Sequence, residues 1–239
     1  MDDEQLAARV RELHAEGMST NQIARQLEVP RGRVAPLVRA LVRSAKATTA
    51  EPAVAGCWVS AGWSVGLSVP EGHDWPDRRS RGPEPSGLVG VLVARETRRG
   101  GDEVSVAGYL VDTYCLGVKD ALPPRRMSGR RLHRRVEDFF DGFEGPPVEV
   151  PIELARHLVW GAVDYARGLG FEPHPDLRLA SGHLGPLDGP CAIGFGHEGK
   201  PYYIQGPYDD AGRILRTLER TVGRDNFHFL VGADAFELA

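Results

Sequence analysis

The stretch STNQIARQLEVPRGRV, residues Ser19–Val34, decides how the N-terminal part of the chain folds. Ser19 or Thr20 can cap a helix, and Glu28-Val29-Pro30 can form a turn before a further helix that begins at Arg31. Apolar residues recur at the spacing of one helical face before, within and after the stretch, at Leu6, Val10, Leu13, Ile23, Ala24, Leu27, Val34, Leu37, Val38 and Leu41. This pattern predicts three short helices that end near Ser44 and share one small core.

The order Ile23-Ala24, Leu27, Val29 and Val34 resembles the packing positions of the helix-turn-helix superfamily, as found in resolvases and bacterial regulators. The resemblance implies a DNA-binding domain over residues 1–44, with arginines at the major groove and polar residues near phosphates. The residues expected to contact DNA are Thr20, Asn21, Gln22, Arg31, Arg33 and Arg39. Residues 17–46 hold six basic residues and one acidic residue, and this net charge of +5 suits contact with DNA.

Two residues depart from the superfamily pattern. Glu28 stands at a turn position where the family often has glycine, because the position favours a positive φ. Pro36 lies inside the predicted third helix, where it removes a backbone hydrogen bond and costs about 3 kcal/mol in a regular helix. The helix is therefore expected to kink there or to begin later. The alternative for residues 1–44 is a small helical bundle that docks a protein.

Composition narrows the class of protein. The chain has 239 residues and a net charge of −4, so it is not a polybasic nucleic-acid binder as a whole. Its three cysteines are far apart and form no CxxC pair, which argues against a disulfide framework and a zinc ribbon. The acidic start does not read as a signal peptide, and no apolar run reaches the length of a membrane span. A cytoplasmic protein is expected.

In the remainder of the chain, composition and periodicity predict a linker over residues 45–56 and a second domain over residues 57–239. A flexible Pro- and Gly-rich loop is expected at residues 70–87. The predicted elements are strands at Cys57–Ser68, Leu88–Arg98, Glu103–Tyr114 and Phe227–Val231, a hairpin over Ala192–Ile204, and helices at Met127–Phe140, Pro151–Leu169 and Ala211–Val222. Because hairpins and helices do not alternate as βαβ units, the predicted fold class is α+β with an antiparallel sheet.

Side chains with catalytic potential gather where a predicted strand ends, at Asp112, Cys115 and Lys119. A thiolate beside a lysine could serve as a nucleophile, and a small buried cysteine near a solvated Lys-Asp pair is the alternative. The histidines and cysteines further along do not match the spacing of a common zinc module. No metal and no cofactor are therefore predicted.

Three segments of the second domain resemble a domain of uncharacterised bacterial proteins, over residues 57–233. They are Tyr109–Asp112 with Cys115–Asp120, then Tyr165-Ala166 with Leu169–Phe171 and Pro173–Asp176, then Phe195-Gly196 with Gly199–Pro201 and Gly206-Pro207. The resemblance implies no activity. It adds His174, Asp176 and Lys200 to the candidate site residues named above.

A basic cluster marks the start of the helix predicted at Met127–Phe140, and its members include Arg130, Arg131, Arg134 and Arg135. Cations at a helix N-terminus oppose the macrodipole, so the cluster is expected to bind either a nucleic-acid backbone or acidic neighbours such as Asp138. A plain solvated face of the helix is the further alternative.

The function expected from these observations is a cytoplasmic DNA-binding protein and transcriptional regulator. Its second domain would sense a ligand, dimerise or recruit a partner, and tight specific binding would require a homodimer. One alternative is an enzyme that uses the residues around Asp112, Cys115, Lys119 and His174. Another is an RNA-associated or structural module that binds through the arginine cluster.

Overall fold

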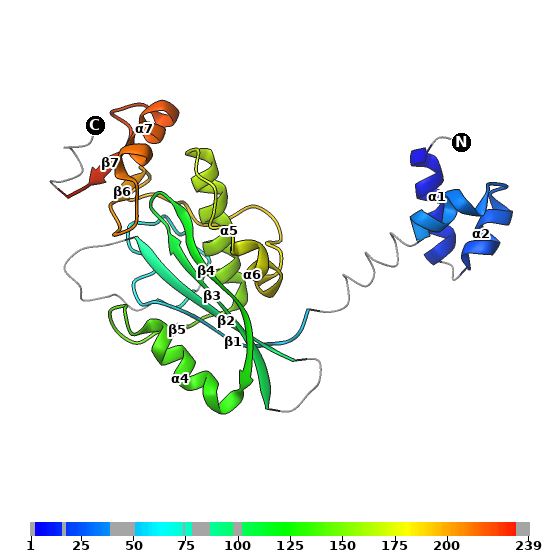
Figure 1. Ribbon diagram of the computed structural model, residues 1–239, viewed down its shortest axis with the longest axis horizontal. Coiled ribbons are helices and arrows are strands. Elements are labelled where there is room, and N and C mark those ends of the chain that lie inside the picture. Colours follow the sequence, from blue (N-terminus) through cyan, green and yellow to red (C-terminus); the bar gives the residue numbers. More distant parts are fainter. Residues whose placement is uncertain are drawn as a thin grey trace. The chain divides into compact units, whose positions relative to one another are not determined.

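The computed structural model describes residues 3–15, 18–38, 51–73, 75–77, 87–97 and 102–232. The chain divides into two compact units, Met1–Glu51 and Pro52–Ala239, which we call the head and the body (Figure 1). The boundary falls inside the predicted linker of residues 45–56, of which 45–50 lie outside the described residues. Residues 54–56 belong to a strand instead, because Val54 pairs with Arg95 and Gly56 pairs with Ala94 of the neighbouring strand.

The head contains helices α1 (Asp3–Ala15) and α2 (Thr20–Gln26) and a helical segment over residues 31–38. Its core is formed by Leu6, Val10, Leu13, Ile23, Ala24, Val34 and Val38, as the apolar spacing predicts. Ser19 caps α2 through a reciprocal pair of hydrogen bonds with Gln22, and Glu28 adopts a φ of 52° at the turn. The segment 31–38 stays helical across Pro36.

The body is built on a five-stranded antiparallel sheet of order β4-β3-β2-β1-β5. Its strands are β1 (Val54–Val59), β2 (Leu88–Glu96), β3 (Glu103–Asp112), β4 (Gly117–Ser128) and β5 (Val148–Glu149). The sequence did not predict β4, because Pro123 and Pro124 interrupt it. Strand β4 lies at the edge of the sheet, where prolines are tolerated.

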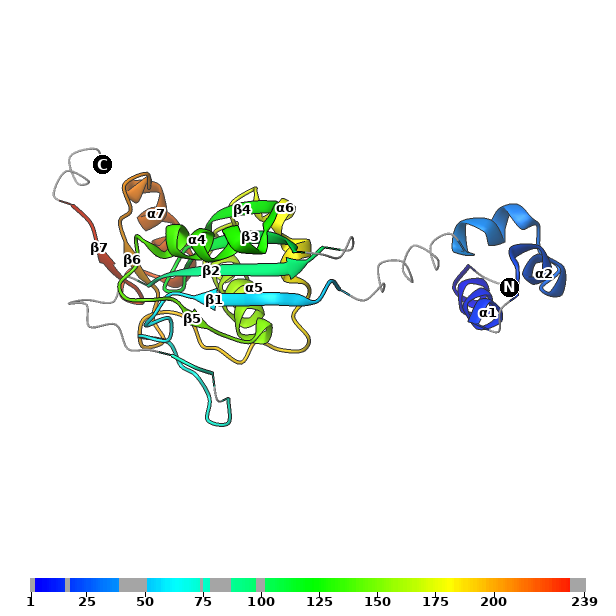
Figure 2. The same cartoon turned by 90° about the horizontal axis from the view of Figure 1, so that it is seen from below.

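Helices cover both faces of this sheet (Figure 1, Figure 2). Helix α4 (Gly129–Phe140) packs on one face through Val136 and Phe140, against Leu92, Ala94 and Val106. Helices α5 (Ile152–Gly168) and α6 (Leu177–Leu184) cover the other face, where the largest core lies. The helix predicted from Met127 begins at Gly129, because β4 continues to Ser128, and α6 was not predicted.

At one end of the sheet lies a βαβ unit made of β6 (Tyr202–Ile204), α7 (Ala211–Val222) and β7 (His228–Leu230). The prediction of a hairpin over Ala192–Ile204 is wrong. His197 and Lys200 do form a tight turn, but β6 pairs in parallel with β7 rather than with the residues before the turn.

Part of the predicted flexible loop at 70–87 is packed. The carboxylate of Asp77 accepts hydrogen bonds from the backbone N–H groups of Gly62 and Ser64 at 3.0 and 3.2 Å, and the indole N–H of Trp63 donates to the Pro76 carbonyl at 3.0 Å. Residues 74 and 78–86 lie outside the described part of the chain.

Candidate functional site

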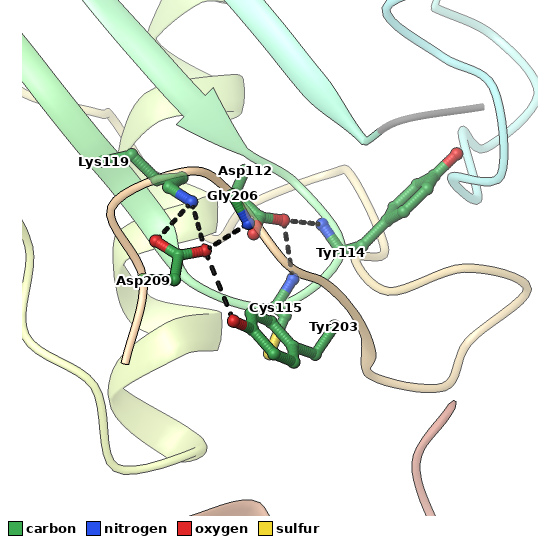
Figure 3. Close-up of polar contacts among 7 residues, drawn as sticks. All are labelled: Asp112, Tyr114, Cys115, Lys119, Tyr203, Gly206 and Asp209. Atoms are coloured by element: carbon green, nitrogen blue, oxygen red, sulfur yellow. Dashed lines mark hydrogen bonds and ion pairs between the residues drawn. The ribbon is translucent and has the colours of Figure 1, made fainter. Parts of the chain in front are cut away.

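Asp112 ends β3 and is the centre of the first candidate site (Figure 3). Its carboxylate is buried, and Oδ1 accepts the backbone N–H groups of Tyr114 at 2.9 Å and Cys115 at 3.0 Å. Burial raises the pKa of Asp112 to about 6, although those hydrogen bonds and the charge of Lys119 oppose the shift. The carboxylate therefore fixes the turn that leads from β3 into β4.

Lys119 and Asp209 form a mostly buried ion pair beside this turn. The Lys119 ammonium lies 2.8 Å from both carboxylate oxygens of Asp209, and the two side chains are only 18% and 11% exposed. Oδ2 of Asp209 also accepts the backbone N–H of Gly206 at 2.8 Å and the Tyr203 hydroxyl at 3.5 Å (Figure 3). The carboxylate is thus fully occupied by partners from within the body.

Cys115 does not behave as an activated nucleophile. Its side chain is fully buried, and burial followed by the charge of Asp112 raises the pKa of the thiol well above its usual range. Lys119 lowers that pKa too little to compensate, because its ammonium is already paired with Asp209. The burial of Cys115 and this shift count against a thiolate made reactive by Lys119 and favour the alternative of a small buried cysteine.

The other three candidate residues do not join this group. His174 lies at the surface with its Nδ1 3.8 Å from Oδ1 of Asp120, and Asp176 stands at the start of α6. Lys200 is exposed in the turn that follows His197. The structure therefore brings together Asp112, Cys115 and Lys119. His174 approaches them through its backbone, whose N–H donates to the Val118 carbonyl at 2.9 Å. Among the described residues, the side chains of His174, Asp176 and Lys200 form no hydrogen bond or ion pair with the three.

Sequence reasoning missed Asp209, Tyr203 and Tyr165. Two adjacent aspartates, Asp209 and Asp210, precede α7, and the cap is formed by Asp210, whose Oδ1 accepts the backbone N–H of Arg213 at 2.9 Å. Tyr165 comes from α5, and its hydroxyl is buried without a hydrogen-bond partner among the described residues. Burial raises its pKa, with further contributions from Cys115 and Asp112.

We call Asp112, Cys115, Lys119, Tyr203 and Asp209 the buried polar cluster. Lys119 and Asp209 form an ion pair, the Asp112 carboxylate accepts two backbone N–H groups, and burial raises the pKa of the Cys115 thiol. These contacts join the β3–β4 turn to the segment between β6 and α7. The arrangement is that of a structural tie rather than of a reacting centre.

The second candidate site is the head. Asn21, Gln22, Arg31 and Arg33 are exposed, whereas Thr20 is half-buried. The side-chain oxygen of Gln22 takes part in the helix cap, accepting the Ser19 N–H at 2.9 Å. Its amide nitrogen makes no hydrogen bond among the described residues. Arg39 lies outside those residues.

A third candidate is an open hollow beside β6 and β7 with a volume of about 420 Å³. All of its lining residues among the described part of the chain are aromatic, namely His197, Tyr202, Phe227, His228 and Phe229. Tyr202 is stacked on Tyr114 with ring centroids 6.3 Å apart, and the Tyr114 hydroxyl donates to the Val65 carbonyl at 2.7 Å. Ring faces and imidazole nitrogens suit a planar heteroaromatic ligand.

The described residues contain no group of three or more histidine, cysteine or acidic side chains able to hold a metal ion. None of the helices in the described segments combines the length and apolar character needed to cross a membrane. Comparison with protein-family models, with curated proteins and with solved structures found no match for this chain. The two resemblances noted in the sequence therefore stay predictions.

Proposed function

We propose that the chain is a DNA-binding protein and a transcriptional regulator whose head contacts DNA. The observation that supports this most directly is the position of Arg31 and Arg33. Both are exposed at the start of the helical segment 31–38, while Val34 of the same turn is buried in the head core. A short helix that exposes arginines at its first turn and packs on a small core has the features of a recognition helix that enters the DNA major groove.

The start of α2 supports the same proposal. Asn21 is exposed there, and the amide nitrogen of Gln22, which makes no hydrogen bond within the described segments, is a donor at a helix N-terminus, where the macrodipole favours an anion. The cysteines of the chain are all free thiols, which suits the reducing cytoplasm, and we place the protein there. A homodimer is part of the proposal, because one head offers few base contacts.

Fluorescence anisotropy of a labelled duplex pool at low salt tests the proposal on the full chain. Wild type should bind, and Arg31→Ala with Arg33→Ala should weaken binding by at least about tenfold, because each lost bidentate contact is worth about 1–3 kcal/mol. Arg213→Ala with Arg216→Ala, on exposed positions of α7, is the matched control and should bind as wild type does. Equal binding by all three proteins would overturn the proposal.

The hollow beside β6 and β7 favours a second function, which is ligand sensing by the body. A planar heteroaromatic ligand bound there should raise the melting temperature of wild type in a thermal-shift panel of nucleosides and related rings. Tyr202→Ala removes the ring stacked on Tyr114 and should abolish the shift. A shift of equal size in the variant would place the ligand elsewhere.

A further inference from the structure

Residues 121–136 of the body contain six arginines and no aspartate or glutamate. Four of them lie on α4, and we call Arg130, Arg131, Arg134 and Arg135 the arginine face. With 3.6 residues per turn, the four fall within an arc of about 140° of the helix circumference. The opposite side of the helix carries Val136 and Phe140, which are buried against the sheet, so the arginines point outward.

The arginine face has no partner within the described part of the protein. Arg130, Arg131 and Arg134 are exposed and Arg135 is half-buried, and none of the four guanidinium groups forms an ion pair or a side-chain hydrogen bond among the described residues. Pairing with Asp138, the internal alternative, does not occur. Asp102 lies at the start of the helix: its backbone carbonyl accepts the Gly129 N–H at 2.6 Å, and its carboxylate lies beside Gly129 without an ion pair to any of the four arginines among the described residues.

The placement of these charges is unfavourable for the isolated helix. The first turn of α4 carries no acidic residue, and Ser128 makes no side-chain cap. Positive charge in the first turn of a helix opposes the macrodipole and costs about 0.3–1 kcal/mol for each charge. By contrast, α7 places Arg220 in its last turn, where the macrodipole favours it. No ion pair with these arginines offsets that cost among the described residues, and an external anion would offset it.

We infer that the arginine face binds the phosphate backbone of duplex DNA, as a second contact surface that rests on the proposed function of the head. Rows Arg130–Arg134 and Arg131–Arg135 each span one helical turn of about 6 Å, and guanidinium groups bind phosphate oxygens in bidentate fashion. Two contact surfaces on one chain raise affinity through effective concentration, because the second contact becomes intramolecular.

Charge and surface chemistry separate DNA from a membrane as the partner. Lipid-binding helices combine basic residues with exposed apolar side chains that enter the bilayer interface. The exposed large hydrophobic residues of the described chain are Val54, Val65, Leu88, Leu179, Tyr208, Phe229 and Leu230. None of them belongs to α4. The arginine face therefore carries the positive charge that a polyanion requires, without the exposed apolar side chains that would enter a bilayer.

The test is a salt titration of duplex binding by the full chain, with Arg130, Arg131, Arg134 and Arg135 all changed to Gln. Each phosphate contact that is lost should reduce the slope of log K against log salt by about 0.9, so the slope should fall by about 2–4. Affinity at low salt should fall at least about tenfold. Arg213, Arg216 and Arg220 of α7, all changed to Gln, form the matched control, which should change affinity less than about twofold.

The variants separate this inference from the proposed function. Loss of binding in the Arg31→Ala, Arg33→Ala protein with an unchanged slope in the α4 variant would overturn the arginine face and leave DNA binding by the head intact. A reduced slope in the α4 variant with unchanged binding by the Arg31→Ala, Arg33→Ala protein would support DNA binding by the arginine face and overturn DNA binding by the head. Equal loss in the α4 and α7 variants, or tighter binding to duplex RNA or to anionic vesicles than to duplex DNA, would also overturn the inference.

Discussion

The buried polar cluster and the arginine face differ in how their cationic side chains are surrounded. In the buried polar cluster, the Lys119 ammonium meets both oxygens of Asp209 at 2.8 Å, and water is largely excluded from the pair. On the arginine face, four guanidinium groups stand at the surface of α4 without a partner among the described residues. The body thus pairs the mostly buried charges of Lys119 and Asp209 and leaves the charges of the arginine face without an ion pair among the described residues.

This difference separates residues that serve the fold from residues available to a partner. A buried charge must be paired, since an unpaired one costs several kcal/mol, and its pairing therefore says little about function. An exposed charge needs no partner for the fold, so a one-signed group set against a helix dipole requires another explanation. Sequence motifs drew attention to Asp112, Cys115 and Lys119, but their geometry assigns them to the fold.

The largest expected effect comes from breaking the buried pair. Asp209→Asn leaves the Lys119 ammonium mostly buried without a carboxylate, so the free energy of unfolding of the body should fall by about 3 kcal/mol. The four tryptophans of the chain, Trp58, Trp63, Trp75 and Trp160, all belong to the body. Urea unfolding followed by tryptophan fluorescence therefore reports this unit.

An exposed pair of the same body provides the control for this change. Arg167 and Glu172 lie 3.3 Å apart with side chains 51% and 79% exposed, and Glu172→Gln should cost less than about 0.5 kcal/mol. Adding Lys119→Met to Asp209→Asn should restore part of the lost stability, because no unpaired charge then remains buried. If Asp209→Asn costs no more than Glu172→Gln, the cluster is not a structural tie.

A smaller, pH-dependent effect is expected at Asp112. Its pKa of about 6 in the folded state exceeds the ordinary value near 4, so the folded state binds this proton more tightly than the unfolded state does. Stability from this group is complete below pH 4 and is lost as the pH rises to 6. Asp112→Asn keeps the oxygen that accepts the Tyr114 and Cys115 N–H groups and cannot ionise.

The free energy of unfolding of the Asp112→Asn variant should therefore rise relative to that of wild type by about 2 kcal/mol between pH 4 and pH 6. Urea unfolding at each pH measures this difference. The variant's stability relative to wild type should be constant above that range. A difference that does not change between pH 4 and 6 would mean that Asp112 titrates as an ordinary carboxyl.

Local sequence patterns anticipated the elements that local physics determines. The head core, the Ser19 cap, the β2 and β3 strands and helix α5 follow from apolar spacing and capping chemistry. Strand β4 could not be predicted, because its prolines are tolerated only at a sheet edge and no local pattern identifies an edge. Asp209 could not be paired with Lys119 for the same reason: 90 residues separate them, and only the tertiary fold brings them together.

The smallest effect is expected from the arginine face, and its sign distinguishes it from the cluster. Changing Arg130, Arg131, Arg134 and Arg135 to Gln removes like charges from the start of α4 and breaks no ion pair or side-chain hydrogen bond among the described residues. The body should therefore become more stable, by about 0.5–1 kcal/mol at low salt, and the gain should shrink as salt screens the helix dipole. Urea unfolding at two salt concentrations measures both quantities. A loss of stability above about 1 kcal/mol would show that the arginines serve the fold, as Lys119 does, and the contrast between the two regions would disappear.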